Sequence, residues 1–394
     1  MHRIRQSPTD PAFVQNPYPF YDRARALGSI VFWEDYGMPC ALSHAAVNAI
    51  MRDRRFGREI PPERRQPIAE HTAPFYAIEA HSMLELEPPR HTRLRGLVLR
   101  AFTSRRIAAL EPEIAALAHE LIDRFPAGRF DLLAHFAQVI PVVVIARLLG
   151  VPEGMKDQLL DWSHAMVSMY HAGRTRATEE RAGRASAEFA DFMRAYVDER
   201  RARPGDDLIT HLIAAEEEGE KLSTDELITT CILLLNAGHE ATVHGIGNGV
   251  KTLLEAGGPQ DWLAPGQVAA TVEELLRYDP PLHMFTRHAY ETVEVLGQVF
   301  QPGDEVACLL AAAARDAQVW AEPHRFDPRR PAKPHLAFGV GLHFCVGAPL
   351  ARLEMAAALP ILFERCPGLR LAAPPRYSDS YHFHGLDALM VEAG

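Results

Sequence analysis

A single long helix, predicted between residues 223 and 255, most constrains how this chain can fold. It starts at Ser223-Thr224-Asp225-Glu226, the pattern of a capping box, in which a hydroxyl caps the helix and a glutamate bonds back to the cap residue. Residues 231–237 are apolar on nearly every side, which is typical of a helix buried all round. Such a helix is roughly 45–50 Å long. Its middle must therefore cross the interior, with the other elements packed around it.

Helical periodicity dominates the rest of the chain. Apolar residues recur at helical intervals over 17–27, 43–52, 105–125, 132–149, 155–170, 177–203, 206–215 and 350–362. Short strands are predicted at 30–33, 40–42, 293–295, 299–300 and 305–308. No linker or repeat divides the sequence. We therefore predict a mainly α fold with small β-sheets, as a single domain over 1–394 in which a small β-rich region, about 28–43 and 288–310, packs on the helical body.

The composition excludes several classes of protein. With 41 Lys and Arg against 51 Asp and Glu, the net charge is −10, whereas a nucleic-acid binder needs a basic face. The five cysteines form no C-x-x-C pair, which argues against a disulfide scaffold or a zinc ribbon. The most apolar run, 139–151, contains Pro141 and Arg147 and is too short to span a bilayer. No signal-peptide pattern is present, so we expect a soluble, cytoplasmic protein that binds neither nucleic acid nor membrane.

Residues 338–347, which read FGVGLHFCVG, carry the strongest chemical signal. The three glycines allow the positive φ and close backbone approach that a loop needs if it is to converge on one sulfur. Cys345 lies just before a predicted helix, whose partial positive charge favours the thiolate, and a thiolate is a suitable soft ligand for iron. An isolated cysteine is more often a small buried hydrophobe. The glycine spacing and the flanking His343 favour a ligand here.

This decapeptide resembles the haem-binding loop of the cytochrome P-450 superfamily, F-x-x-G-x-(H/R)-x-C-x-G, and matches every fixed position from Phe338 onward. The resemblance is to the bacterial soluble haem-thiolate monooxygenases and extends over nearly the whole chain. It implies the cytochrome P-450 fold, with haem b held without a covalent bond, and Cys345 as the proximal ligand of its iron. A cysteine thiolate in that position favours cleavage of the O–O bond.

Glu274 and Arg277 match the family's E-x-x-R motif. Residues at i and i+3 share a helix face, so the pattern alone is also that of an ordinary surface ion pair. The resemblance implies instead a buried pair with a structural role, which fixes the cysteine loop together with Arg325.

His91 and Arg95 match the family's H-T-x-x-R segment. Without the match to this segment, the two residues would be interpreted as part of a basic, solvent-exposed helix face. The resemblance places both at the haem propionates, together with Arg287 and His343. Two carboxylates under a largely buried ring need several charge-assisted hydrogen-bond donors, and these four side chains would supply them.

Residues 237–242, in the middle of the long helix, read AGHEAT. A charged Glu240 is costly there unless it has a partner or a function, and a local distortion beside Gly238 is expected. The family's pattern is A-G-x-(D/E)-T, in which an acid and an alcohol relay protons. Glu240 matches the acid, but Ala241 occupies the alcohol position. Because Thr242 is displaced by about 100° around the helix, we expect protons to arrive through ordered water, with Thr242 helping indirectly.

Two neighbouring patterns are set aside. His239 and His244 flank Glu240 as in a zinc-protease signature, but they are five residues apart, whereas that chemistry needs histidines four apart on one helix face. The glycines of 245–249 lie inside a helix and lack the spacing of a dinucleotide-binding loop.

By resemblance, the substrate pocket draws on residues 78–86, 166–170, 234–241, 282–286 and 380–384. The expected contacts are Leu84, Met169, Ala237, His283, Phe285 and Phe383. The apolar ones are, taken singly, more typical of a core. The histidines at 283, 382 and 384 point to a polar or hydroxylated ligand.

The resemblance also implies partners and an activity. With 394 residues there is no room for a fused reductase, so electrons are expected from NAD(P)H through a ferredoxin reductase and a ferredoxin. A basic patch could contact an acidic ferredoxin, formed by Arg100, Arg105, Arg106, Arg329, Arg330 and Arg352. We expect a monooxygenase that inserts one atom of dioxygen into a small, largely apolar organic substrate. Two alternatives stay open: a peroxide-driven peroxygenase, which Ala241 allows, and a non-catalytic haem or ligand sensor.

Overall fold

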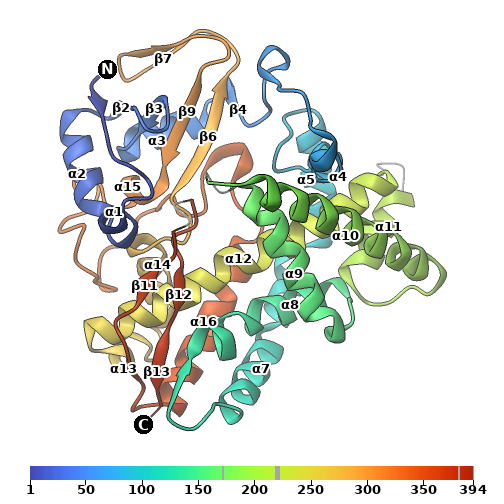
Figure 1. The fold of residues 1–394 in the computed structure, drawn as a ribbon. Helices are drawn as coiled ribbons and strands as arrows, with labels where there is room; N and C mark the ends of the chain where they lie inside the picture. Colours follow the sequence, from blue (N-terminus) through green and yellow to red (C-terminus); the bar gives the residue numbers. More distant parts are fainter. Residues whose placement is uncertain (171–172, 218–221, 380–381, 394) are drawn as a thin grey trace. The chain divides into compact units, whose positions relative to one another are not determined.

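A computed structural model describes residues 1–170, 173–217, 222–379 and 382–393. These residues group into two units, the first made of Met1–Arg64, Glu113–Gln138 and Ala241–Gly394, and the second of Arg65–Pro112 and Val139–Glu240. The long helix α12 (Thr224–Ala256) belongs to the second unit up to Glu240 and to the first from Ala241 onward. Figure 1 labels this helix. The prediction of a single domain stays a prediction.

The first unit contains a six-stranded mixed sheet with the order β1-β2-β3-β9-β6-β4. The pairs β2/β3, β6/β9 and β4/β6 are antiparallel, whereas β1/β2 and β3/β9 are parallel. Its strands are β1 (Arg3–Ile4), β2 (Ile30–Trp33), β3 (Met38–Ala41), β4 (Phe56–Gly57), β6 (Met284–Ala289) and β9 (Glu305–Leu309). Helices α3 (His44–Arg52) and α15 (Leu310–Ala314) contact this sheet, and Figure 1 shows both beside its strands.

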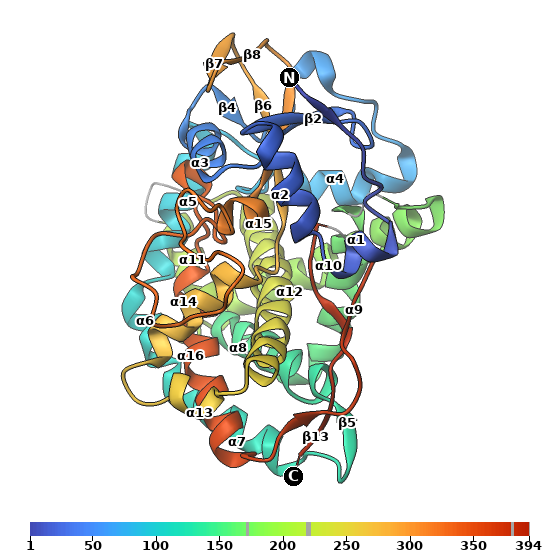
Figure 2. The same ribbon diagram turned by 90° about the vertical axis from the view of Figure 1, so that its left-hand side faces the viewer.

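The remaining elements of the first unit are helices and smaller sheets. Figure 2 shows β5 beside β13 near the C-terminus, in a three-stranded sheet of the order β10-β13-β5. The other strands are β5 (Arg129–Asp131), β7 (Val293–Val295), β8 (Gln298–Phe300), β10 (Arg370–Leu371), β11 (Arg376–Tyr377), β12 (Leu386–Ala388) and β13 (Met390–Glu392). The helices are α1 (Pro11–Gln15), α2 (Tyr18–Leu27), α3 (His44–Arg52), α7 (Glu111–Asp123), α13 (Pro259–Trp262), α14 (Val268–Tyr278), α15 (Leu310–Ala314) and α16 (Ala348–Arg365).

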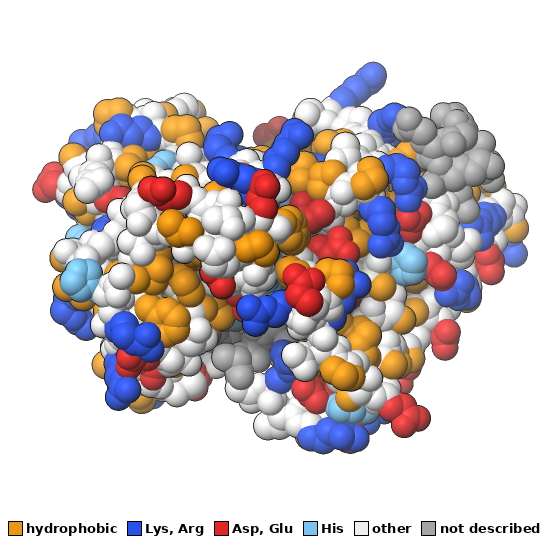
Figure 3. Space-filling view, turned by 90° about the horizontal axis from the view of Figure 1, so that it is seen from above, with side chains coloured by type: hydrophobic (Ala, Val, Ile, Leu, Met, Phe, Trp, Pro, Cys, Tyr) orange, Lys and Arg blue, Asp and Glu red, His pale blue; other side chains and the backbone are white. Residues whose placement is uncertain are grey.

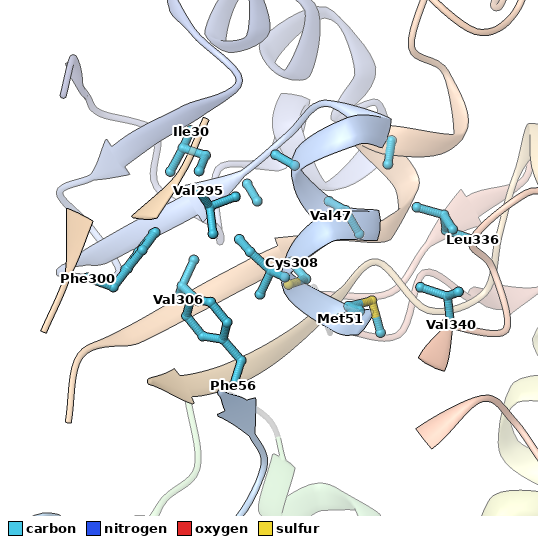
Figure 4. Close-up of a cluster of buried hydrophobic side chains, with 14 of the residues drawn as sticks. Ile30, Val47, Met51, Phe56, Val295, Phe300, Val306, Cys308, Leu336 and Val340 are labelled. Carbon is cyan, nitrogen blue, oxygen red and sulfur yellow. The ribbon is translucent and has the colours of Figure 1, made fainter. Parts of the chain in front are cut away.

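A hydrophobic core joins the six-stranded sheet to α3 (Figure 4). Val47 and Met51 of α3 and Cys308 of β9 belong to it, and so do Leu336 and Val340, which directly precede and enter the cysteine loop. Burying one such large side chain contributes roughly 1.5–3 kcal/mol. The core therefore holds the start of the loop against α3.

The second unit consists of helices and short turns. Its helices are α4 (Ala73–Glu79), α5 (Arg90–Ala101), α6 (Ser104–Ala109), α8 (Val139–Leu149), α9 (Lys156–Val167), α10 (Arg176–Ala202), α11 (Leu208–Glu217) and the first part of α12. The capping box at the start of α12 is confirmed: the amide of Ser223 donates to Glu226 at 2.8 Å and the amide of Glu226 donates to the Ser223 hydroxyl at 3.2 Å. Among the described residues, no helix combines the length and apolar character needed to cross a membrane.

Three sequence expectations differ from the structure. The segment 105–125 is divided at Leu110 into α6 and α7, because Pro112 has no N–H to continue the first helix. The segment 132–149 opens with a π-helical turn, Leu133–Ala137, before α8. Residues 224–256 are helical throughout, so the helix is not interrupted beside Gly238, where a distortion is expected.

Candidate functional site

The cysteine loop is closed by its own backbone. The amide of Cys345 donates to the carbonyl oxygen of Phe338 at 3.0 Å, and the amide of Ala348 donates to the carbonyl oxygen of Cys345 at 3.4 Å. His343 lies between them in a 3-10 turn, Gly341–His343, and α16 begins at Ala348. The sulfur is therefore presented from a loop that leads directly into a helix N-terminus, as the sequence predicts.

Two glycines allow this loop to lie against α3. Gly339 and Gly341 have φ of +68° and +78°, a left-handed conformation that residues with a side chain rarely adopt. A Cβ atom at Gly341 would lie 2.4 Å from the carbonyl oxygen of Met51. Any larger residue at position 341 would therefore push the loop away from α3.

Cys345 is the one exposed cysteine of the five in the sequence. Burial raises the pKa of the Cys231 and Cys308 thiols to about 12, and it also raises the pKa of Cys40 and Cys366. Because only the thiolate is a good metal ligand, these four buried thiols are poorly suited to the task. Cys345 therefore offers the one exposed thiol of the chain as a ligand for a soft metal such as iron.

Glu274 and Arg277 of α14 form a buried, two-pronged ion pair. The Nε and Nη2 atoms of Arg277 donate to the Glu274 carboxylate at 2.7 and 2.8 Å, and the two side chains are 1% and 5% exposed. Arg277 Nη1 also donates to the carbonyl oxygens of Ala314 and Pro323, each at 3.0 Å. The amide of Asp327 donates to Glu274 at 2.9 Å. Each charge is thus paired and hydrogen-bonded, which a buried ion pair requires.

The further charged partner of Glu274 is Arg330, not Arg325. The side chain of Arg325 is 62% exposed and lies 3.2 Å from Glu322, and only its carbonyl oxygen accepts a hydrogen bond from Arg277, at 3.4 Å. Arg330 is 11% exposed, and its Nε lies 3.4 Å from Glu274. Arg325 thus joins the pair through its backbone carbonyl, and the arginine side chain that reaches Glu274 is that of Arg330. The structural role predicted for Arg325 stays a prediction.

A second carboxylate, Glu273, connects α14 to α16 and to the residues of the cysteine loop. Arg352 Nη2 donates to Glu273 at 3.0 Å, and His335 Nε2 lies 3.2 Å from the same carboxylate. The guanidinium of Arg352 also lies 4.5 Å from the ring centroid of Phe338. Burial raises the pKa of Glu273, but the hydrogen bonds from His335 and Arg352 outweigh it and lower the pKa to about 2. Glu273 adjoins the E-x-x-R motif, yet sequence reasoning missed it.

These ion pairs leave fewer arginines available in the basic patch that is predicted to bind a ferredoxin. Arg330 is largely buried against Glu274, and Arg352 is paired with Glu273. Arg106 lies 3.6 Å from Asp206. Figure 3 shows Lys and Arg side chains interspersed with Asp and Glu over the face that it presents. A docking patch built on Arg100, Arg105 and Arg329 stays a prediction.

Strand β6 carries Phe285 and Arg287. Only its last two residues fall in the β-rich region predicted from the sequence, which starts at about residue 288. Arg287 is 2% exposed, and its Nη1 donates to the carbonyl oxygen of Thr286 at 2.8 Å. Phe285 packs partly buried against the hydrophobic core, and the guanidinium of Arg58 lies 5.0 Å from its ring centroid. Arg58 is thus a cation near an expected pocket residue that sequence reasoning did not find.

His283 lies in a buried polar network and not on an accessible surface. It is 0% exposed, its Nδ1 lies 3.0 Å from the Tyr21 hydroxyl, and its ring centroid lies 4.3 Å from that of His384. His384 Nε2 lies 3.5 Å from Asp279, which also accepts a hydrogen bond from Tyr18 at 3.2 Å. Burial lowers the pKa of both histidines well below the usual value, which keeps them neutral. Contact of His283 with a ligand stays a prediction, although its ring is buried and contacts Tyr21 and His384 in this structure.

The other expected pocket residues differ in exposure. Met169 is 3% exposed, and Leu84 is partly buried, both in the second unit. Phe285 and Phe383 are partly buried in the first unit, and Ala237 is exposed. Ser380 and Tyr381 lie outside the described residues. Contact of these side chains with a substrate stays a prediction.

In the second unit, α5 carries His91 and Arg95 one turn apart. His91 is 1% exposed and Arg95 is partly buried. Arg93, between them, forms an ion pair with Glu226 of the capping box. Burial raises the pKa of Glu226, but bonds from Ser223 and Arg93 outweigh it, and the pKa is lowered. The Arg93–Glu226 pair therefore ties α5 to the start of α12, which sequence reasoning did not foresee.

An accessible stripe runs along one face of helix α12. Leu233, Ala237, Ala241 and His244 are partly or fully exposed, and their spacing of three or four residues places them on one helix face. Thr242 is only 6% exposed. The position of the missing alcohol, Ala241, therefore lies on the accessible stripe, whereas Thr242 does not.

Comparison with known proteins settles the family. The family model described as Cytochrome P-450 matches residues 59–256 and 268–368. The chain belongs to the cytochrome P-450 family. The P-450 monooxygenase PikC of Streptomyces venezuelae is 37% identical over an alignment 384 residues long, which covers 92% of this chain and 87% of PikC. The nocardicin C N-oxygenase of Nocardia uniformis subsp. tsuyamanensis is 39% identical over an alignment 352 residues long, which covers 86% of this chain and 85% of the oxygenase.

A solved P-450 structure is similar over the whole chain. P450BioI, in complex with an acyl carrier protein ligated to hexadec-9Z-enoic acid, has a TM-score of 0.90 at 33% identity and covers 97% of this chain and 99% of its own. The predicted fold class, mainly α with small β-sheets, is confirmed. The protein is accordingly a P-450 oxygenase, a haem-iron oxidoreductase that uses haem b, dioxygen, a substrate and NAD(P)H electrons delivered by redox partners.

The residues of the first unit fit haem b. Cys345 is the exposed cysteine, and it is held on a loop braced by Met51 and by the Glu273–Arg352 pair. The roles at the haem propionates that the resemblance implies for Arg287, His343, His91 and Arg95 stay predictions. These roles are carried over from the family's motifs.

Proposed function

We propose that this P-450 is a haem-thiolate monooxygenase that receives electrons from a separate ferredoxin and oxidises a small, largely apolar organic molecule. The observation that carries the proposal is the single exposed cysteine, Cys345, on a loop that matches the haem-binding motif. When bound, haem supplies the activation of dioxygen: one oxygen atom enters the substrate, the other leaves as water, and two electrons and two protons are consumed.

The apolar character of the substrate is supported by the chain and by its relatives. Three members of the accessible stripe on α12, Leu233, Ala237 and Ala241, are apolar. Similar solved P-450 structures hold hexadec-9Z-enoic acid on an acyl carrier protein, testosterone, and myristic acid. All three small molecules are largely hydrocarbon, so an apolar substrate surface fits this chain as well.

Glu240 would be the acid that moves protons in this reaction. It is 17% exposed and lies in the middle of α12, beside the accessible stripe. Since Ala241 has no hydroxyl, and Thr242 is buried, ordered water would carry the proton from the Glu240 carboxyl. Peroxide-driven oxygenation is the second candidate, because the same absence of an alcohol weakens proton delivery.

An Ala241→Thr variant is expected to form more product per reducing equivalent, by up to about tenfold, since general acid–base groups contribute roughly 10²–10⁴-fold where they are well placed. The new hydroxyl would lie on the accessible stripe, where Ala241 lies now. The measurement is product formed against NAD(P)H consumed. Thr242→Ala is the matched control and should change this ratio less than about twofold. An unchanged Ala241→Thr, with coupling lost in Thr242→Ala, would assign the alcohol role to Thr242.

The function is tested by turnover under ¹⁸O₂. Apolar candidate substrates are first screened for displacement of the iron-bound water by the change in the haem spectrum. With NAD(P)H, a ferredoxin reductase and a ferredoxin, the product should then carry one labelled oxygen atom. Product formed only when hydrogen peroxide replaces the redox partners would establish a peroxygenase. Consumption of NAD(P)H with no oxygenated product from any ligand that binds would favour the sensor.

A further inference from the structure

His239 of α12 presents a lone pair to its surroundings. Its Nδ1 lies 3.0 Å from the carbonyl oxygen of Leu235, and because a carbonyl can only accept, the ring hydrogen of Nδ1 is donated there. In the neutral ring, Nε2 is then an acceptor. The side chain is 2% exposed, and Nε2 is buried without a hydrogen-bond partner among the described residues. Such an atom needs either a proton donor or a cation.

Two further ligand atoms converge on this nitrogen. The Oε2 atom of Glu240 lies 3.4 Å from His239 Nε2 and 3.6 Å from the Nε2 atom of His164, which α9 contributes. All three atoms lie within 4.8 Å of one another. Around a tetrahedral Zn²⁺ with bonds of about 2.0–2.2 Å, neighbouring ligand atoms are roughly 3.4 Å apart. The two distances from the Glu240 oxygen to the imidazole nitrogens are therefore close to those between ligands of one ion.

We propose that His164, His239 and Glu240 bind one divalent transition-metal ion of the Zn²⁺ type, with water as a fourth ligand. A cation between the His239 lone pair and the Glu240 carboxylate would remove the repulsion between two acceptors. The Leu235 carbonyl already holds His239 as an outer partner holds a metal-bound histidine. Mixed imidazole and carboxylate ligands suit Zn²⁺, whereas Mg²⁺ and Ca²⁺ prefer oxygen ligands alone.

The site uses a different histidine from the zinc-protease pattern in the sequence. His244 belongs to the first unit, where its ring centroid lies 6.4 Å from that of Phe383. His164 takes its place as the second imidazole. It is 48% exposed, which gives an ion a path to the buried His239.

Metal binding would inhibit the enzyme, and this part rests on the proposed function. A metal ion on Oε2 would hold the Glu240 carboxylate in place and keep it from accepting a proton. Electrons would then be consumed with less product. The site would thus make turnover sensitive to the supply of zinc.

Zinc binding to the ferric holoenzyme tests the site directly. The protein is dialysed against micromolar Zn²⁺ with excess Mg²⁺, and bound zinc is measured by atomic spectrometry and titration calorimetry. Wild type should bind one Zn²⁺. His164→Ala and His239→Gln should bind it at least about 100-fold more weakly. Loss of a residue that only hydrogen-bonds to a metal ligand already lowers metal affinity by roughly 10–100-fold, and loss of a ligand should lower it at least as much. His119→Ala, at an exposed histidine of the first unit, should bind like wild type. Equal zinc affinity in wild type, His164→Ala and His239→Gln would overturn the site.

Inhibition of turnover by zinc tests the proton-relay role of Glu240 separately from the existence of the metal site. Zn²⁺ should lower the amount of product formed per NAD(P)H consumed in wild type. In His164→Ala, the same ratio should be equal with and without Zn²⁺. If zinc binds through His164 and turnover is unchanged, the metal site stands and the relay role of Glu240 fails. If zinc does not bind through His164, the metal site fails while the monooxygenase proposal stands.

Discussion

A Cys345→Ala variant is expected to lose the strongly red-shifted Soret band that the reduced, carbon-monoxide-bound protein should show, and at least about 99% of its oxygenase activity. Cys345 is the one exposed cysteine, and the other four are buried with raised pKa values, so no other thiolate can replace it. The measurements are the carbon-monoxide difference spectrum and product formation at equal haem content.

Cys366→Ala is the matched control for this experiment. Cys366 is 7% exposed and follows α16, so its loss should lower stability by roughly 1 kcal/mol and leave the spectrum unchanged. An unaltered red-shifted band in Cys345→Ala would mean that another group binds the iron, and the assignment of Cys345 would be wrong.

Replacing Arg277 by alanine should have the largest effect on stability. The guanidinium is 1% exposed and holds Glu274, together with the carbonyl oxygens of Ala314 and Pro323. Its removal leaves a buried carboxylate without its main partner, which costs about 3–5 kcal/mol, a large part of the roughly 5–15 kcal/mol that stabilises a protein. Unfolding in urea, followed by circular dichroism, measures the loss, and the yield of haem-loaded protein should fall with it.

Arg325→Ala is the control variant. It shows whether a loss of stability comes from the buried network around Arg277 or from the removal of any arginine. The Arg325 side chain is 62% exposed, so its removal should change the free energy of unfolding by no more than about 0.5 kcal/mol. Arg330→Ala should lie between the two, because Arg330 is a secondary partner of Glu274. A loss in Arg325→Ala as large as that in Arg277→Ala would contradict the arrangement of these three arginines.

The features that sequence reasoning found are local ones. The capping box at Ser223 and Glu226, the neighbouring strands β2 and β3, and the helix after Cys345 each depend on residues a few positions apart. Side-chain periodicity and turn residues record such contacts directly. The same holds for the Glu274–Arg277 pair, whose spacing on a helix places both side chains on one face.

The features that sequence reasoning missed depend on segments far apart in the sequence. Nothing near Glu240 indicates that His164 lies beside it, and nothing near Glu274 distinguishes Arg330 from Arg325. The full extent of β6 was missed because its buried residues do not alternate with exposed ones, as those of a strand with one exposed face would. Such partners are decided by tertiary packing, which a single sequence does not record.

The contrast between one exposed sulfur and four buried ones has a practical use. A thiol-reactive dye applied to the native protein should label Cys345 when the prosthetic group is missing and label nothing when iron occupies the sulfur. Dye incorporated per chain would then count the empty molecules in a preparation. Purification batches could be compared by fluorescence alone, before any substrate is known.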